Sequence, residues 1–366
     1  MRPNKMPKLR IGDLEVDIPI IQGGMGVGVS LSGLATTVAN EGGIGVISSA
    51  GIGMLEADFE RNFKEANKRA LLREIKSAKV MTKGIIGVNI MVALSDYDEH
   101  LKTAVAGGAD LVFLGAGLPL KVPKIWPPGE WEKVTTKIVP IVSSSRAAQI
   151  IFQSWQKHYH CVPDAVVVEG PLAGGHLGFK KEQIGNPEYT LEKILPGVIS
   201  VIKPFEQYSG KKIPVIAAGG VYTGADIYKF IQLGAAGVQM ATRFVATYEC
   251  DAAADFKNAY IKCSKEDLVI IDSPVGLPGR AIRNGFLEQL ESGNKIPFKC
   301  PWKCLKTCDL KSSPYCIARA LTNAQKGHLE QGFAFAGANA YRIDKIISVK
   351  ELIKTLMMEY EKAESI

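Results

Sequence analysis

A histidine with glycines on both sides is the residue best suited to acid–base chemistry. His176 lies in the segment EGPLAGGHLG at positions 169–178, directly after an apolar run that predicts a strand. An imidazole flanked by glycines in a loop is in a poor position for core packing. Its near-neutral pKa suits proton transfer at physiological pH. We therefore expect His176 to be catalytic, with a loop histidine that forms only local hydrogen bonds as the alternative. The other histidines lie on expected helices or loops and are interpreted as structural or solvated: His100, His158, His160 and His328.

Two further strand ends combine glycine with small polar residues. One apolar run ends in AAGG at positions 217–220, and the next ends in QMATRF at positions 239–244. Glycines expose backbone N–H groups and Thr242 adds a hydroxyl donor, which is typical of phosphate binding at a turn before a helix. The pattern predicts a phosphate site, and a tight turn that merely needs glycine is the alternative.

Four of the seven cysteines are close together in the sequence. They are spaced by four, four and eight residues: Cys300, Cys304, Cys308 and Cys316. Clustered cysteines in a chain without a secretory signal indicate a metal or iron–sulfur site more than disulfides. The spacing matches neither the CxxC pairs of zinc sites nor the ferredoxin pattern. The sequence leaves open zinc, an iron–sulfur cluster, or reduced thiols packed in a helical lid.

Eight short apolar runs are the elements that must position these residues. Each is nearly continuous in Val, Ile, Leu or Ala, as in strands buried on both faces of a parallel sheet, and most precede a stretch with helical periodicity. The runs are 18–24, 43–49, 84–91, 110–115, 138–144, 164–169, 213–219 and 237–243. Eight such units within about 240 residues fit a (β/α)8 barrel better than an open doubly wound sheet. The predicted fold class is therefore α/β, a TIM barrel with the site at its strand ends.

The pattern changes after the eighth run. Residues 250–330 show helices and loops, include the clustered cysteines and contain no further strand repeat. Residues 349–362 have the amphipathic pattern of a helix that could close the barrel. We expect residues 1–249 and 331–366 to form the barrel, and residues 250–330 to form a helical insertion that covers the active-site face.

The composition argues against several classes of protein. The chain has 366 residues, of which 46% are hydrophobic and 22% charged, and this is typical of a globular protein. The net charge of +7 is mild, and no basic run resembles a nucleic-acid-binding arm. No apolar stretch reaches the roughly 20 residues of a membrane span, and no apolar signal core follows the basic N-terminus. We expect a cytoplasmic protein that acts on a small anionic molecule without a nucleic-acid or membrane partner. A homodimer is one of the oligomeric states that remain open.

Five motifs occur in order along the chain. They are QGGM at 22–25, GVNIM at 87–91, EG at 169–170 with AGGH at 173–176, AAGGV at 217–221 and GVQMATRF at 237–244. Together they resemble the motifs of the nitronate monooxygenase (2-nitropropane dioxygenase) family, which includes the flavin-dependent enoyl-acyl-carrier-protein reductase II. The resemblance resumes in GRAIRN at 279–284 and FAGAN at 335–339. It implies a barrel that binds FMN.

The resemblance also implies roles for individual residues. His176 corresponds to the catalytic histidine of the family, and Glu169 would lie at the flavin or its ribityl chain. The residues implied at the flavin ring and beside it are Gly23, Gly24, Met25, Asn89, Glu169 and Gly174, and those implied at the phosphate are Gly219, Gly220, Gln239, Met240, Ala241 and Thr242. Ala241 stands where many members have glycine, so its methyl group would narrow the phosphate loop.

The function implied by the resemblance is FMN-dependent oxidation of alkyl nitronates or nitroalkanes. His176 would stabilise an anionic substrate or abstract an α-proton from a neutral one. In the alternative, NAD(P)H is the electron donor, an enoyl thioester is reduced, and His176 protonates its α-carbon. A more distant alternative is a flavin-free isomerase or lyase acting on a phosphorylated metabolite. It would need charged residues at other strand ends, where this sequence has mostly small neutral ones.

Overall fold

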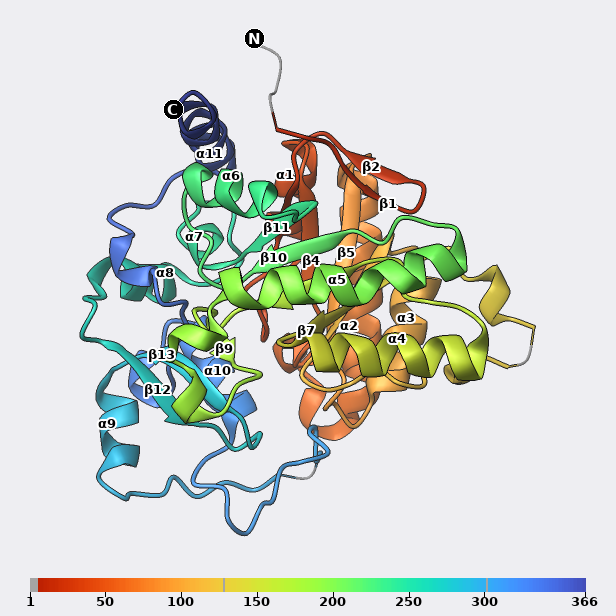
Figure 1. Cartoon of the computed structure of the whole chain (residues 1–366). Helices are drawn as coiled ribbons and strands as arrows, with labels where there is room; N and C mark the ends of the chain where they lie inside the picture. Colours follow the sequence, from red (N-terminus) through yellow and green to blue (C-terminus); the bar gives the residue numbers. More distant parts are fainter. Residues whose placement is uncertain (1–5, 128, 301) are drawn as a thin grey trace.

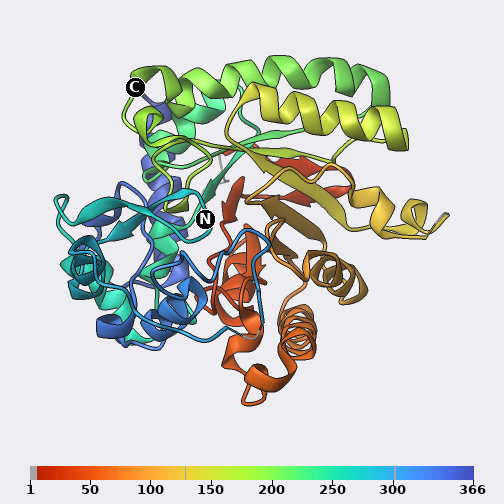
Figure 2. The same cartoon turned by 90° about the horizontal axis from the view of Figure 1, so that it is seen from below.

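Eight parallel strands form a closed barrel in the computed structural model, which describes residues 6–127, 129–300 and 302–366. Around the barrel the strands follow the order β10-β11-β3-β4-β5-β6-β7-β8, and each neighbouring pair is parallel. Their bounds are β3 (Ile20–Gln22), β4 (Ile44–Ser48), β5 (Ile85–Met91), β6 (Leu111–Gly115), β7 (Lys137–Val142), β8 (Val166–Glu169), β10 (Val215–Ala218) and β11 (Gly237–Met240). The predicted TIM barrel is confirmed, and each predicted apolar run overlaps one of these strands (Figures 1 and 2).

Side chains of the barrel strands alternate between two apolar cores. Ile20 and Val112 belong to the core between the strands and the surrounding helices, whereas Ile21 and Phe113, one residue further, fill the barrel interior. Successive side chains of a strand point to opposite faces of a sheet, and here both faces are buried. This double burial is why the runs are continuously apolar in the sequence.

A short antiparallel hairpin closes the amino-terminal end of the barrel. It consists of β1 (Leu9–Ile11) and β2 (Leu14–Val16), whose apolar side chains join the interior core. Asp13 in its turn forms an ion pair with Lys137 at the start of β7, with a distance of 2.6 Å between Oδ1 and Nζ. The hairpin lies at the top of Figure 1, away from the carboxyl ends of the strands.

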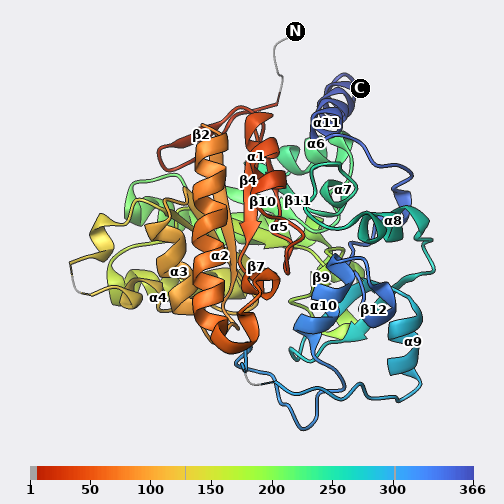
Figure 3. The ribbon, with the colours of Figure 1, turned by 180° about the vertical axis from the view of Figure 1, so that it is seen from behind.

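Helices cover the outside of the barrel. They are α1 (Ser32–Asn40), α2 (Phe59–Met81), α3 (Tyr97–Ala106), α4 (Ser145–Tyr159), α5 (Leu191–Ser209), α6 (Gly224–Gln232), the short α7 (Thr242–Val245) and α11 (Val349–Glu364). The C-terminal helix α11 packs against α6 and α1 and so closes the ring, as its amphipathic sequence predicts (Figure 3). Among the described helices, none has both the length and the apolar character needed to cross a membrane.

Short 3₁₀ helices lie in the connections. They are η1 (Ile52–Leu55), η2 (Val122–Ile125), η3 (Trp131–Lys133), η4 (Lys181–Gln183), η5 (Pro187–Tyr189), η6 (Leu329–Gln331) and η7 (Ala340–Arg342). None of these 3₁₀ helices lies within a barrel strand, so they leave the strand pairing of the barrel intact.

The segment 250–330, called the insertion below, contains strands as well as helices. Its elements are α8 (Ala254–Lys262), β12 (Leu268–Asp272), β13 (Pro278–Ile282), α9 (Gly285–Glu291) and α10 (Ile317–Gln325). β12 and β13 form an antiparallel hairpin, and β13 also pairs with β9 (Gly175–His176) from the loop after β8. The expectation of helices and loops alone missed this hairpin, although the run LVIID followed by a turn with proline and glycine is a hairpin signal.

A long irregular stretch of the insertion, residues 293–316, reaches back to the barrel. We call its described residues the strap. The amide of Ser95, after β5, donates to the carbonyl of Cys304 at 3.0 Å, and the amide of Lys306 donates to the carbonyl of Ala93 at 2.9 Å. Trp302 packs on Phe59 at the start of α2, with ring centroids 4.8 Å apart. The strap therefore ties the insertion to the β5 side of the barrel mouth.

Candidate active site

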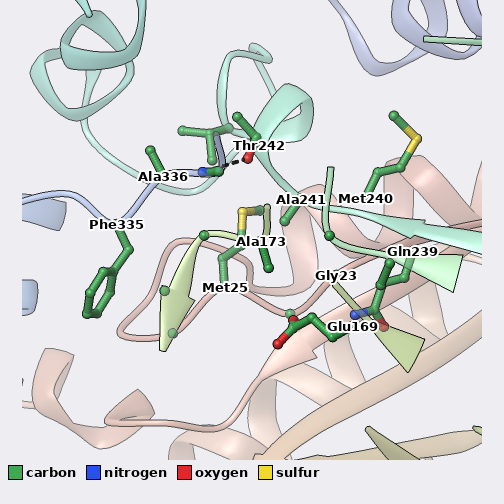
Figure 4. Close-up of a pocket in the computed structure, with 18 of the residues that line it drawn as sticks. Gly23, Met25, Glu169, Ala173, Gln239, Met240, Ala241, Thr242, Phe335 and Ala336 are labelled. Atoms are coloured by element: carbon green, nitrogen blue, oxygen red, sulfur yellow. Dashed lines mark hydrogen bonds between the residues drawn. The ribbon is translucent and has the colours of Figure 1, made fainter. Parts of the chain in front are cut away.

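A cavity of about 300 Å³ lies at the carboxyl ends of the barrel strands (Figure 4). Each strand contributes a residue at or near its end, namely Gly23, Ser48, Asn89, Gly115, Ile141, Glu169, Gly219 and Gln239. The cavity is closed from outside the barrel by Phe256, Tyr260, Leu321, Phe335, Ala336 and Gly337. This face is where TIM barrels carry their active sites.

The residues assigned from sequence to catalysis or to a flavin all line this cavity. They are His176 together with Gly23, Gly24, Met25, Asn89, Glu169, Gly174, Gly219, Gly220, Gln239, Met240, Ala241 and Thr242. The register explains part of this convergence, because Ala218 of β10 is opposite Glu169 of β8 on one side and Gln239 of β11 on the other. Their placement is a structural fact, and their individual roles remain predictions.

The turn after β10 presents bare backbone to the cavity. Gly219 and Gly220 have φ angles of 83° and 106°, a region that side-chain-bearing residues rarely adopt. In the described part of the chain, neither of their amide N–H groups has an acceptor. Asn339 fixes the turn from behind, since its Nδ2 donates to the carbonyl of Gly220 at 2.8 Å. The turn therefore has two backbone donors without a protein acceptor, on residues that line the cavity.

Thr242 adds a hydroxyl beside this turn. Its Oγ1 accepts a hydrogen bond from the amide of Gly337 at 3.1 Å, which leaves the hydroxyl hydrogen for a ligand (Figure 4). No Lys or Arg side chain lines the cavity among the described residues. Behind its wall, Arg243 donates to the carbonyl of Tyr222 at 3.1 Å, and the Arg342 guanidinium lies 4.2 Å from the Tyr222 ring centroid. An anion at this end would be held by neutral donors with two cations behind them.

His176 is held on the opposite side of the cavity by the insertion. β9 pairs with β13 so that His176 is opposite Gly279. Its Nε2 lies 2.7 Å from Oγ of Ser273, and its ring meets the ring of Phe335 edge-on, with centroids 5.0 Å apart. Burial lowers the pKa of His176 to about 4, so the imidazole is neutral at physiological pH.

Glu169 ends β8 and is the acidic side chain of the cavity lining in the described part of the chain. Burial raises the pKa of its carboxyl to about 7. Near neutral pH it can therefore donate a hydrogen bond when protonated or accept one when ionised. Figure 4 shows it on the same wall as Gly23 and Gln239.

Sequence reasoning missed several residues that shape this site. Arg280 on β13 is buried and donates through Nη1 to the carbonyls of Pro171 and Ala173, at 2.7 and 2.6 Å, and so fixes the loop before His176. Burial lowers its pKa to about 10. Ser273 and Phe335 contact His176 itself. The motif GRAIRN contains Arg280, but nothing local in the sequence marks Ser273.

The four cysteines that are clustered in the sequence were predicted as a possible metal site. In the described ranges, no group of three or more His, Cys, Asp or Glu side chains is arranged to hold a metal ion. The geometry therefore gives no support to the metal predicted at Cys300, Cys304, Cys308 and Cys316, which are free thiols. Cys300 packs with Phe59 and Trp302, whereas Cys304 and Cys308 pack against the main core. Burial, together with the neighbouring thiols of Cys316, Cys300 and Cys308, raises the pKa of Cys304 to about 12, so this thiol stays protonated when no metal is bound.

The family model described as nitronate monooxygenase matches residues 8–359. A probable nitronate monooxygenase from Staphylococcus aureus (strain Newman) is 28% identical over 304 residues, covering 76% of this chain and 78% of that protein. The "(3aS,4S,5R,7aS)-5-hydroxy-7a-methyl-1-oxo-octahydro-1H-indene-4-carboxyl-CoA dehydrogenase" of Mycobacterium tuberculosis is 27% identical over 280 residues, covering 76% of this chain and 67% of that protein.

Two solved structures share the architecture. FabK from Thermotoga maritima aligns with a TM-score of 0.72 and 27% identity, over 96% of this chain and 94% of that chain. A nitroalkane oxidase from Streptomyces ansochromogenes aligns with a TM-score of 0.72 and 21% identity, over 96% of this chain and 97% of that chain. The second likeness shows the fold alone.

Proposed function

Because the chain belongs to the nitronate monooxygenase family, whose model spans residues 8–359, we propose that this oxidoreductase uses FMN to oxidise alkyl nitronates or nitroalkanes. The observation that carries the proposal is the cavity, which is lined both by backbone amides without a protein acceptor and by a half-buried imidazole. When bound, FMN supplies the electron-accepting chemistry that amino-acid side chains lack.

The turn after β10 fits the phosphate of FMN. The free amides of Gly219 and Gly220 and the hydroxyl of Thr242 are three neutral donors, a set that suits a phosphoryl group at a turn before a helix. The guanidinium groups of Arg243 and Arg342 lie behind Tyr222, and the attraction of Arg243 for an anion at this end is partly offset by Glu359, 3.9 Å from it.

The glycines of the QGGM motif fit a flat ring, but for different reasons. A Cβ added to Gly24 would lie 2.3 Å from Cβ of Asn89, so the packing of the protein itself demands glycine there. A Cβ added to Gly23 would meet Cγ of Gln239 at 3.4 Å, an ordinary contact. The protein alone therefore tolerates a side chain at position 23. Glycine there leaves cavity space that the added methyl group would fill, which supports a ligand that approaches the backbone closely.

His176 would manage protons and charge at the reacting end of the substrate. Its neutral imidazole can donate a hydrogen bond to a substrate oxygen or accept a proton, depending on which ring nitrogen carries hydrogen. Phe335 beside it, with Phe256 and Tyr260, excludes water from this end of the cavity. Exclusion of water strengthens any hydrogen bond formed there.

The absorbance spectrum of the purified protein tests the cofactor. We expect a yellow protein that releases about one FMN per chain on denaturation, since the cavity offers one phosphate site. A colourless protein that gains no flavin absorbance when FMN is added contradicts the proposal. The reaction is tested by anaerobic mixing, in which propyl nitronate should bleach the flavin, while NADH and NADPH should leave it oxidised.

Reduction of an enoyl thioester by NAD(P)H is the second candidate. The likeness to FabK, an enoyl-acyl-carrier-protein reductase, favours it, as do the apolar side chains of Phe256 and Leu321 on the outer wall of the cavity. The same anaerobic experiment separates the candidates, because rapid bleaching by NADH or NADPH followed by reoxidation with an enoyl thioester supports the reductase.

A further inference from the structure

Ser273 is placed to decide which nitrogen of His176 carries the proton. It follows β12 at the first position of the turn to β13 and is 7% exposed. Oγ of Ser273 lies 2.7 Å from Nε2 of His176, although the two residues are 97 positions apart in the sequence. Nothing in the five motifs or in the comparisons assigns a role to this serine.

The turn holds the serine and the histidine in one sheet. The amide of Gly276 donates to the carbonyl of Ser273 at 2.9 Å, and the φ angle of Gly276 is 87°, which closes the turn tightly. On the other strand the amide of Leu177, next to His176, donates to the carbonyl of Pro278 at 2.8 Å. The hydroxyl and the imidazole are therefore fixed by backbone hydrogen bonds on both sides.

The other contacts of the Ser273 hydroxyl determine whether it donates a hydrogen bond to His176 or accepts one. A serine hydroxyl has one hydrogen to donate and two lone pairs. The amide of Val275 donates to Oγ of Ser273 at 3.2 Å, which uses one lone pair. Among the described residues, Nε2 of His176 is the only acceptor within reach of the hydroxyl hydrogen. The reverse direction would leave that hydrogen without a protein partner at a nearly buried site, which is costly.

We propose that Ser273 is a positioning residue whose hydroxyl donates to Nε2 of His176 and so holds the imidazole as the tautomer protonated on Nδ1. Nδ1 has no protein partner among the described residues and is not one of their buried, unpaired polar atoms, so it keeps some exposure on a residue that lines the cavity. Burial lowers the pKa of His176 and so keeps the ring neutral at physiological pH. A neutral ring carries its one N–H hydrogen on either Nδ1 or Nε2.

The tautomer determines the kind of substrate that the site can use. An imidazole with hydrogen on Nδ1 and an occupied Nε2 has no free lone pair for a substrate proton. It can donate a hydrogen bond to an oxygen that already carries negative charge, such as a nitronate oxygen, but it cannot readily deprotonate a neutral nitroalkane. This inference rests on the proposed function, and it narrows the substrate class to pre-formed anions.

NMR of the flavin-loaded protein labelled with ¹⁵N-histidine tests the tautomer directly, with the His176 signals identified by their loss in His176→Asn. We expect Nδ1 protonated and Nε2 unprotonated in the wild type, mixed tautomers in Ser273→Ala, and recovery of the wild-type pattern in Ser273→Thr. Protonation on Nε2 in the wild type overturns the inference, and this readout requires only that the assignment variant His176→Asn folds.

Kinetics of the same proteins give a second readout. Ser273→Ala should lower kcat for propyl nitronate about tenfold with little change in KM, since one hydrogen bond is worth about a tenfold change. It should also lower the preference for the nitronate over the neutral nitroalkane. The control is Thr307→Ala, because Thr307 donates to the carbonyl of Val275 at 3.0 Å and supports the same turn without touching His176. Equal losses in both variants would mean that Ser273 only supports the turn.

The outcomes distinguish this inference from the proposed function. A protein that binds no FMN contradicts the proposed function, yet its His176 tautomer can still be measured. A protein that binds FMN and oxidises nitronates, but carries the proton on Nε2, contradicts only the role of Ser273.

Discussion

The cavity has two walls that are built in different ways. The wall formed by the ends of β10 and β11 presents backbone amides and small residues, such as Gly219 and Gly220. The facing wall, formed by β9 and the hairpin β12–β13, presents side chains, among them His176 with Ser273 behind it. The first wall depends on the register of the barrel, and the second depends on an insertion that joins a loop by strand pairing. Binding of the cofactor and reactivity should therefore respond to different substitutions.

The largest effect is expected from the side-chain wall. His176→Ala should retain FMN, because the phosphate donors are on the other wall, and should lower turnover about 10²–10⁴-fold, the range for an acid–base group. Flavin content and steady-state rates with propyl nitronate measure the two properties separately. The control is His328→Ala, since the side chain of His328 is 60% exposed. Loss of FMN together with turnover in His176→Ala would show that the walls are not independent.

The two walls should also respond oppositely to pH in the flavin-free protein. Burial raises the pKa of Glu169 from 4.5 to about 7, so folding becomes less favourable as pH rises from about 4.5 to 7, because only the unfolded chain loses this proton. Glu169→Gln does not titrate, and its stability relative to the wild type should increase over that window by about 3 kcal/mol at most. Urea denaturation at several pH values measures this, with Glu182→Gln on the surface as the control.

His176 gives the opposite sign. Burial lowers its pKa from 6.5 to about 4, so the unfolded chain takes up a proton first as pH falls, and stability is lost between about 6.5 and 4. His176→Gln should flatten this acid side of the stability curve. Unchanged curves in both variants would contradict the burial of these groups.

Substitutions at two neighbouring glycines, Gly23 and Gly24, should distinguish an effect on ligand binding from an effect on protein packing. Gly23→Ala should weaken FMN binding about tenfold while leaving the thermal unfolding of the flavin-free protein unchanged, because its methyl group meets Gln239 and Ala241 at ordinary contact distances and otherwise fills cavity space. Gly24→Ala should destabilise the flavin-free protein by about 1–3 kcal/mol, because its methyl group meets Asn89. Flavin fluorescence titration and calorimetry measure these effects. Equal destabilisation in both would contradict a ligand-based reason for Gly23.

The smallest effect is expected in the strap, which contributes packing to the second wall. A chelator should leave the unfolding temperature unchanged, and elemental analysis should find neither zinc nor iron in stoichiometric amounts. Cys304→Ala should cost on the order of 1 kcal/mol through lost packing. Cys161→Ala, a half-buried cysteine outside the strap, is the matched control. Stoichiometric iron or zinc that is lost in Cys304→Ala would show that the clustered cysteines bind a metal.

Much of the barrel could be predicted from the sequence. Continuous apolar runs predict strands that are buried on both faces, and eight of them predict closure. Parallel strands of a closed barrel end at the same mouth, so glycines and polar residues at those ends, such as Gly219 and Glu169, are brought together by topology alone. The local pattern is sufficient here because strand, turn and ligand-facing residue are adjacent in the chain.

The wall that contains His176 could not be predicted from the sequence, because its contacts join distant segments. Ser273 reaches His176 across 97 positions, and Arg280 holds the loop before it through two carbonyl groups. Nothing in a short stretch of sequence encodes such pairings, because they exist only when β13 adds to β9. The cysteines also needed the tertiary structure: the strap brings Cys300, Cys308 and Cys316 near Cys304, where they help to raise its pKa, yet the described side chains are not arranged to hold a metal ion. Local patterns fix elements and their ends, whereas contacts between distant segments depend on how the whole chain closes.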